Sequence, residues 1–231
     1  MFESERESNV GLIHGNYCNT VENLQRARKQ DPYFEQLMKA VDDAFGNASE
    51  TEVKNTINYL RRNGKMTNNG RLVLKDRADL KNFREKWYKL ADRFTGIVVD
   101  FEDGSGIFRD LVFSAGAPAI DLNKVTKASN MFCNARIEKL SLINTGNITD
   151  MKCMFYNASI TSIDGLDASH ATSISMMFKN IRNFKGKVLP VSVNALDLRS
   201  CTDMSEAFFN SGFRKIALMN TDAVENARNA Y

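Results

Sequence analysis

The sequence has no apolar run that approaches the roughly 18 residues of a membrane-spanning helix. Its N-terminal residues are acidic and polar, and they lack the basic start and apolar run of a secretory signal. Its four cysteines include no close Cys-x-x-Cys pair, which argues against both a disulfide framework and a zinc site. From these absences we expect a soluble chain without an export signal, whose thiols stay free in a reducing compartment.

The common catalytic motifs are also missing. The sequence contains no GxSxG and no HExxH, and the stretch DGSG at 103–106 is not followed by the GK[ST] of a phosphate-binding loop. His14 and Cys18 have the spacing of a metal pair on a helix, but neighbouring glycines disfavour a helix and no second pair exists. His170 lies in a polar segment and does not recur. We therefore expect no catalytic residue, no metal site and no cofactor, in a protein that is not an enzyme.

Composition places the chain among ordinary globular proteins. Apolar residues make up 43% and charged residues 26% of 231 positions, enough for one large domain or two modest ones. The net charge of +3 is too small by itself to imply nucleic acid or a membrane surface as a partner.

What the sequence does contain is one segment written four times. The copies are KVTKASNMFCNAR, NITDMKCMFYNAS, HATSISMMFKNIR and SCTDMSEAFFNSG. Their central aromatics Phe132, Phe155 and Phe178 are 23 residues apart, Phe208 follows after 30, and Tyr231 follows after a further 23. An aliphatic residue followed by Asp or Asn lies twelve residues before each aromatic. Such a period is typical of stacked repeats, in which neighbouring units bury a shared core.

The repeated columns predict a core. Apolar residues three or four apart would share one face of a short helix that Thr149 or Asp150 could cap. An Asn two residues after the aromatic suits a left-handed position at the end of that helix. The predicted core residues are Met131, Phe132, Met151, Met154, Phe155, Ile174, Met177, Phe178, Met204 and Phe208. The Asn column comprises Asn134, Asn157, Asn180 and Asn210.

Short strands and one insertion complete the predicted unit. Brief apolar–polar–polar–apolar pieces at 137–140, 160–163 and 213–216 indicate strands or extended bridges. The seven extra residues between Phe178 and Phe208 fall around FKGKVLPVSVN, so we expect an insertion that bulges from one unit. Cys201 shares an apolar column and is expected in the core.

The best-matching copies, VTKASNMFCNA, ITDMKCMFYNA and CTDMSEAFFNS, resemble the BspA-type leucine-rich repeats of bacterial and mycoplasmal surface proteins. The resemblance covers residues 120–231. It implies a leucine-rich-repeat-like solenoid that serves as a binding or adhesion surface, and it carries over no catalytic residue.

Residues 1–95 show helical patterns instead. They predict helices from Thr20 to Phe45, from Glu50 to Arg62 with a capping box at Ser49, and from Asp76 to Phe94. MTNNGRLVL between the last two predicts a turn and a short strand, and 96–113 predicts a hairpin that caps the first repeat. We thus expect an α+β fold: a mainly helical domain at 1–95, a hairpin or capping linker at 96–119, and a repeat solenoid with a 23-residue period at 120–231.

Charge is uneven in the N-terminal half. Residues 54–93 hold 12 Lys or Arg and 4 Asp or Glu, which is typical of either a nucleic-acid site or a solvated helix face. The basic side chains that would contact nucleic acid are Arg61, Arg62, Lys65, Arg71, Lys75, Arg77, Lys81, Arg84 and Lys86.

Three functions stay open from the sequence. The leading hypothesis is a non-enzymatic protein–protein interaction module that presents the repeat surface to an unknown protein partner. The second is a structural subunit of a larger assembly such as a phage virion, bound to copies of itself or to other subunits. Two observations favour this second hypothesis: the export signal is missing, and the repeat stops at its aromatic column. The third, less favoured, is nucleic-acid binding through 54–93. We expect a cytoplasmic protein or an assembly component rather than one at the cell surface.

Overall fold

The computed structural model describes residues 49–113, 117–183, 192–213 and 215–231, and of residues 88, 89, 92 and 192 the backbone alone. All of these belong to one compact unit, Ala48–Tyr231. The helix predicted from Thr20 to Phe45 and the pair of His14 and Cys18 lie outside the described residues.

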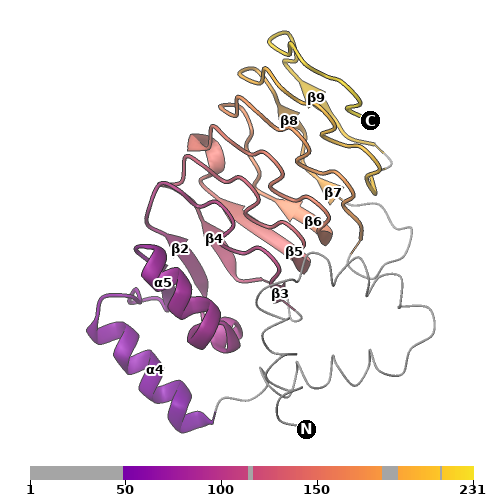
Figure 1. Cartoon of the computed structure of the whole chain (residues 1–231). Helices are drawn as coiled ribbons and strands as arrows, with labels where there is room; N and C mark the ends of the chain where they lie inside the picture. Colours follow the sequence, from indigo (N-terminus) through magenta and orange to yellow (C-terminus); the bar gives the residue numbers. More distant parts are fainter. Residues whose placement is uncertain (1–48, 114–116, 184–191, 214) are drawn as a thin grey trace, which may run out of the picture. The chain divides into compact units, whose positions relative to one another are not determined.

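A parallel sheet dominates the described part (Figure 1). The strands of the main sheet follow the order β1 (Arg71–Leu74), β2 (Gly96–Val99), β4 (Ala119–Asp121), β5 (Arg136–Ile143), β6 (Ser159–Asp164) and β7 (Ser192–Val193). β3 (Val112–Phe113) also pairs with β5, and β8 (Leu196–Asp197) pairs with β9 (Leu218–Met219) in a small second sheet. Each of these pairings is parallel.

One predicted helix is confirmed at its predicted bounds. Helix α4 spans Glu50–Arg62, and the side chains of Ser49 and Glu52 form the expected capping box at its start. Acidic residues in its first turn and basic residues in its last turn suit the helix dipole. The strand predicted in MTNNGRLVL is β1.

The helix predicted from Asp76 to Phe94 is broken into three pieces. Helix α5 covers Arg77–Asn82, a π-helical turn η1 covers Phe83–Trp87, and a 3-10 segment η2 covers Tyr88–Arg93. The apolar residues that defined the pattern are still buried. Apolar spacing therefore identified the buried face of this segment but not its hydrogen-bond pattern.

The predicted fold class is wrong. We expected an α+β chain in which a helical N-terminal domain precedes a leucine-rich-repeat-like solenoid, whereas the described residues form mainly a parallel sheet with two short α-helices, α4 and α5. Strands β1 and β2, which precede residue 120, lie in the same sheet as β4 and β5. A single buried cluster runs from Leu60 to Ala230. No separate helical domain is present among the described residues because their helices pack on this shared core.

The predicted hairpin at 96–113 is also wrong. β2 pairs in parallel with β1 and β4, and β3 pairs in parallel with β5, so no antiparallel pair joins this segment to itself. Alternation of Ile97 and Val99 was compatible with a strand in either kind of pair. The outer side of β1 is covered instead by residues 65–67: the Val73 N–H donates to the Lys65 carbonyl, and the Thr67 N–H donates to the Arg71 carbonyl.

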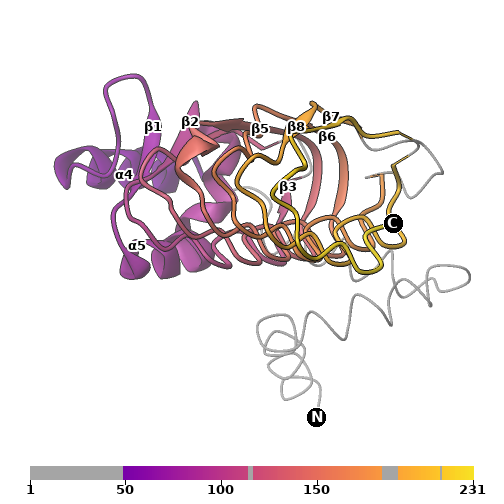
Figure 2. The same ribbon diagram turned by 90° about the horizontal axis from the view of Figure 1, so that it is seen from above.

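The repeat units from residue 103 onward lie side by side. Figure 2 shows the strands along one side and a scalloped row of turns along the opposite side. Within a turn, backbone N–H groups alternate between two acceptors. Met151, Cys153 and Phe155 donate to carbonyls of the following unit. Met154, Tyr156 and Ala158 donate three residues back within their own unit.

This alternation replaces the short helix that was expected to follow a cap at Thr149 or Asp150, which the structure does not form. A helix would keep every N–H within its own unit. Here the adjacent unit supplies half of the acceptors, so neither unit completes its hydrogen bonds alone.

The seven-residue insertion leaves the register intact. Ser173 and Asp203 are bridge partners, as Asp150 and Ser173 are. Residues 184–191, around which the insertion falls, lie outside the described part.

Among the described helices, none has the length and apolar character needed to cross a membrane.

Candidate interaction surface

The columns predicted as core lie in the interior. All ten predicted core residues are buried, and Met154 and Phe155 are 0% exposed, so this pair lines no open groove. The aromatic rings form a continuous stack. Neighbouring ring centroids lie 5.4 Å apart for Phe132–Phe155 and for Phe155–Phe178, 5.5 Å apart for Phe178–Phe208, and 5.6 Å apart for Phe208–Tyr231. Spacings of this size are favourable for offset aromatic pairs.

One further unit of the stack was missed from the sequence. The Phe108 ring stacks on Phe132 at 5.2 Å, and Phe83 closes that end with an edge contact at 6.1 Å. Phe108 precedes Phe132 by 24 residues rather than 23, with Ile107 where later units have Met or Ala and Asp110 where they have Asn. The aromatic spacing together with the acidic residue two positions later was the signal that could have found it.

The units from Phe108 to Phe208 each place left-handed residues two positions before and two positions after the aromatic. The later position is the predicted Asn column, with φ of 57° at Asn134, 54° at Asn157, 61° at Asn180 and 50° at Asn210. These side chains also bond between units: the Asn157 amide donates to Asn134 at 2.9 Å, and the Asn210 amide donates to Asn180 at 2.8 Å. The column thus supplies both a permitted backbone conformation and a cross-unit bond.

Carboxylates organise the other bends of each unit. Asp103, Asp150 and Asp203 each accept the N–H two residues ahead. In the column eleven before the aromatic, Asp167 and Asp197 do the same. Such Asx turns explain why Asp recurs at these positions.

The same bonds perturb the carboxyl groups. Hydrogen bonds from Ser105 lower the pKa of Asp103, and those from the Ser169 backbone and hydroxyl lower the pKa of Asp167. The Arg199 guanidinium, followed by the Asn220 amide, lowers the pKa of Asp197. Each shift has a structural cause within a turn.

The thiols behave as core groups. Cys133 and Cys201 are buried, and Cys153 is half-buried. Burial raises the pKa of Cys153 and of Cys201, which disfavours the reactive thiolate. His170 is exposed and its ring contacts the Ser169 hydroxyl at 3.2 Å. The described residues include no group of three or more His, Cys, Asp or Glu arranged to hold a metal ion.

The nine basic residues proposed for nucleic acid differ in their contacts. Lys65 pairs with buried Asp79, Arg71 pairs with Asp121 at 3.1 Å, and Arg77 pairs with Asp103 at 3.2 Å. Arg84 donates to the carbonyls of residues 107 and 109. The exposed remainder comprises Arg61, Arg62, Lys75, Lys81 and Lys86. Several of the predicted phosphate ligands therefore hold the fold together instead.

Charge separates between two sides of the repeat. We call residues −12 to −5 from each aromatic the acidic edge: 96–103, 120–127, 143–150, 166–173, 196–203 and 219–226. It holds ten Asp or Glu against three Lys or Arg. We call residues −3 to +4 the basic face: 105–112, 129–136, 152–159, 175–182, 205–212 and 228–231. It holds six Lys or Arg against two Asp or Glu.

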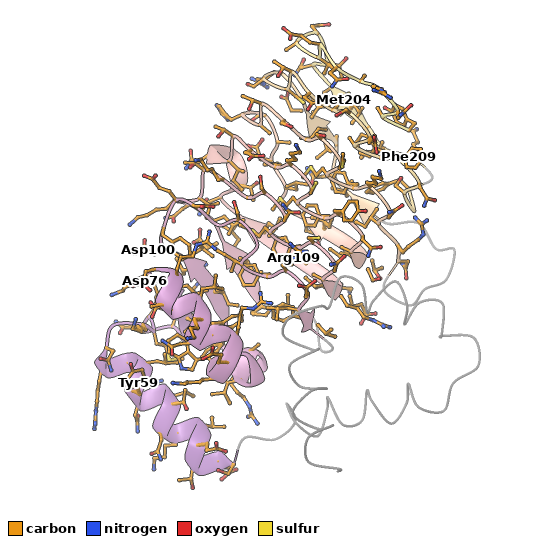
Figure 3. The ribbon with its side chains drawn as sticks, in the orientation of Figure 1. Tyr59, Asp76, Asp100, Arg109, Met204 and Phe209 are labelled. Carbon is orange, nitrogen blue, oxygen red and sulfur yellow. The ribbon has the colours of Figure 1, made fainter. Side chains whose placement is uncertain are left out.

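The basic face carries an aromatic cluster. Phe209 is 41% exposed, and the Lys179 ammonium lies 5.3 Å from its ring centroid while pairing with Glu206. Tyr156 occupies the equivalent column two units earlier and is partly exposed. In Figure 3, Phe209 lies at one margin of the repeat and Asp100, on the acidic edge, at the other. An exposed aromatic beside cations is a typical protein contact site.

Comparison with known proteins gives a family match. A family model described as "Mycoplasma protein of unknown function, DUF285" matches residues 103–221, slightly more than half of the chain. The match begins at the bend of the Phe108 unit and thus includes the unit that the columns left out. No curated protein and no solved structure matches the chain.

Proposed function

The chain belongs to the DUF285 family of Mycoplasma proteins of unknown function, and on that premise we propose that it is a non-enzymatic protein–protein interaction module. The observation that carries the proposal is the basic face, which presents a partly exposed aromatic and several cations. Its backbone is held by hydrogen bonds between neighbouring units. Binding to a rigid surface avoids the entropy cost of ordering it.

The resemblance of the repeated segment to BspA-type repeats, whose surfaces serve in binding and adhesion, supports the same function. The perturbed carboxyl groups point in this direction too, because turn hydrogen bonds account for their lowered pKa values without a catalytic role. A place in the cytoplasm or within an assembly remains our expectation from the sequence.

A capture experiment tests the proposal. The tagged full chain, with and without Phe209→Ala, is incubated with an extract of the cells that make it, and bound proteins are quantified. Tyr59→Ala is the matched control, because Tyr59 is an exposed aromatic on α4, away from the basic face. We expect a protein that wild type and Tyr59→Ala retain and that Phe209→Ala binds roughly tenfold more weakly, as for an interface hot spot. If every captured protein is held equally by all three chains, the basic face is not the binding surface.

A further inference from the structure

We propose that the basic face of one copy of this chain binds the acidic edge of a second copy. This inference rests on the proposed function and names the partner of the same surface. It rests on three features: charges that pair with none of the described residues, a shared spacing, and the location of the two sides.

Each side carries charges that form no ion pair with a described residue. On the basic face, exposed Lys152 and Arg228 form no ion pair with any described residue, and Arg182 donates only to backbone carbonyls and to Asn210. On the acidic edge, the carboxylates without an ion pair to a described residue are Glu102, Asp150, Asp167, Asp203, Asp222 and Glu225. Unpaired charges of opposite sign on separate sides favour contact between copies.

The basic face and the acidic edge have the same spacing because both are formed by the same repeat units. Most units carry at least one cation on the basic face and each carries a carboxylate on the acidic edge, the cation being absent from 205–212. Neighbouring units are separated by the distance between paired parallel strands, about 4.8 Å. An unrelated acidic protein would match this spacing only by accident. A second copy has the same unit spacing, so its carboxylates can lie at multiples of the distance that separates the cations.

The geometry predicts an open array rather than a closed pair. The two sides are different patches, so one contact between two copies leaves a basic face and an acidic edge unused at the ends. Exposed ion pairs are individually weak and are screened by salt, so the contact depends on several pairs and on low ionic strength.

Nucleic acid is the competing polyanion, and the charges next to the cations disfavour it. The Asp150 carboxylate lies two residues from Lys152 and accepts the backbone N–H of that residue. A phosphate chain along the basic face would pass this carboxylate and the others of the adjoining edge. A second copy brings separate carboxylates to the cations at unit spacing, whereas a phosphate chain carries charge along its whole length.

Three double variants of the full chain test the proposal by light scattering across protein concentrations. The basic-face variant is Lys152→Glu with Arg228→Glu, and the acidic-edge variant is Asp222→Lys with Glu225→Lys. The control, Lys139→Glu with Lys215→Glu, makes the same charge change as the first outside both sides. All six residues are exposed, and no side-chain hydrogen bond or ion pair to a described residue involves them, so folding is not at risk.

We expect wild type and control to exceed the 26.0 kDa of one chain at about 10 mM salt and to return to it at about 1 M. Each of the other two variants should associate at least about tenfold more weakly alone. Mixed together they should form dimers and nothing larger, because each retains the side that the other lost.

A wild type that stays at the mass of one chain at low salt overturns the proposal. A control variant that associates as weakly as the basic-face variant overturns it too. Binding of a labelled single-stranded oligonucleotide by a monomeric wild type, lost in the basic-face variant, would assign the face to nucleic acid instead. If wild type is monomeric yet a cellular protein is still lost with Phe209→Ala, the interaction module stands and only self-association fails.

Discussion

The left-handed residue two positions before each stacked aromatic restricts which side chains that position tolerates. Gly106, Asn130 and Asn229 satisfy the restriction, whereas Cys153, Met176 and Glu206 adopt φ near 54° with side chains poorly suited to it. The left-handed conformation costs an ordinary L-residue roughly 1–2 kcal/mol, and Asn less. In these three units the surrounding structure therefore imposes a backbone conformation that the residue itself disfavours.

Replacing the half-buried Met176 with Asn should reduce the cost of the left-handed conformation. We expect Met176→Asn to raise the free energy of unfolding by about 0.5–1 kcal/mol, and the reverse change, Asn130→Met, to lower it by a similar amount. Urea denaturation of the two variants measures both. A destabilised Met176→Asn would show that packing of the Met176 side chain outweighs its backbone conformation.

The turns are the elements that sequence reasoning described least well. The columns located the buried residues because apolar spacing records which side chains face the core. The columns predicted the wrong local structure because apolar residues three and four apart fit either a helix or a turn that is hydrogen-bonded to the neighbouring unit. The distinction depends on acceptors such as the Met177 carbonyl, which lies 22 residues away from the Phe155 N–H that it binds. Helix α4 was predicted at its observed bounds because its capping signals are local.

The Asx turns make the units sensitive to acid. The pKa of Asp167 is lower in the folded chain than in the unfolded chain, so the unfolded state binds more protons as pH falls. The stabilisation is present above the unfolded pKa of about 3.9 and is lost as pH falls through the folded pKa.

We expect Asp167→Asn to lose less stability than wild type between pH 5 and about pH 3, because an Asn oxygen still accepts the Ser169 N–H but does not titrate. Chemical denaturation at several pH values measures this. Equal losses in the two proteins would mean that Asp167 does not contribute to acid unfolding.

At the scale of the whole unit, one core joins the helices to the last repeat. The cluster includes Trp87 in η1 and Phe208 near the opposite end, connected through the aromatic stack. Residues 48–231 should therefore unfold together, and a change in the middle should reach both ends.

Phe155→Ala tests this connection. Loss of a fully buried aromatic should lower the free energy of unfolding by about 3–5 kcal/mol, with similar effects at Phe132 and Phe178. Trp87 is the only tryptophan, so its fluorescence reports the helical side while circular dichroism reports the whole unit. Both probes should shift by the same amount.

The exposed Lys152→Ala is the control for that substitution and should change stability by less than about 0.5 kcal/mol. A shift seen by circular dichroism and not by Trp87 would separate the chain into independently folding parts.

The intact register across residues 184–191 bears on how such a chain can be lengthened. Phe178 and Phe208 stack at 5.5 Å although 30 residues separate them, as closely as partners separated by 23. Extending a loop costs only the logarithm of its length, about 0.6 kcal/mol for each doubling. The site between Asn183 and Ser192 is thus a natural position for grafting an epitope or a fluorescent label, and a place where related chains can diverge in length without losing their stack.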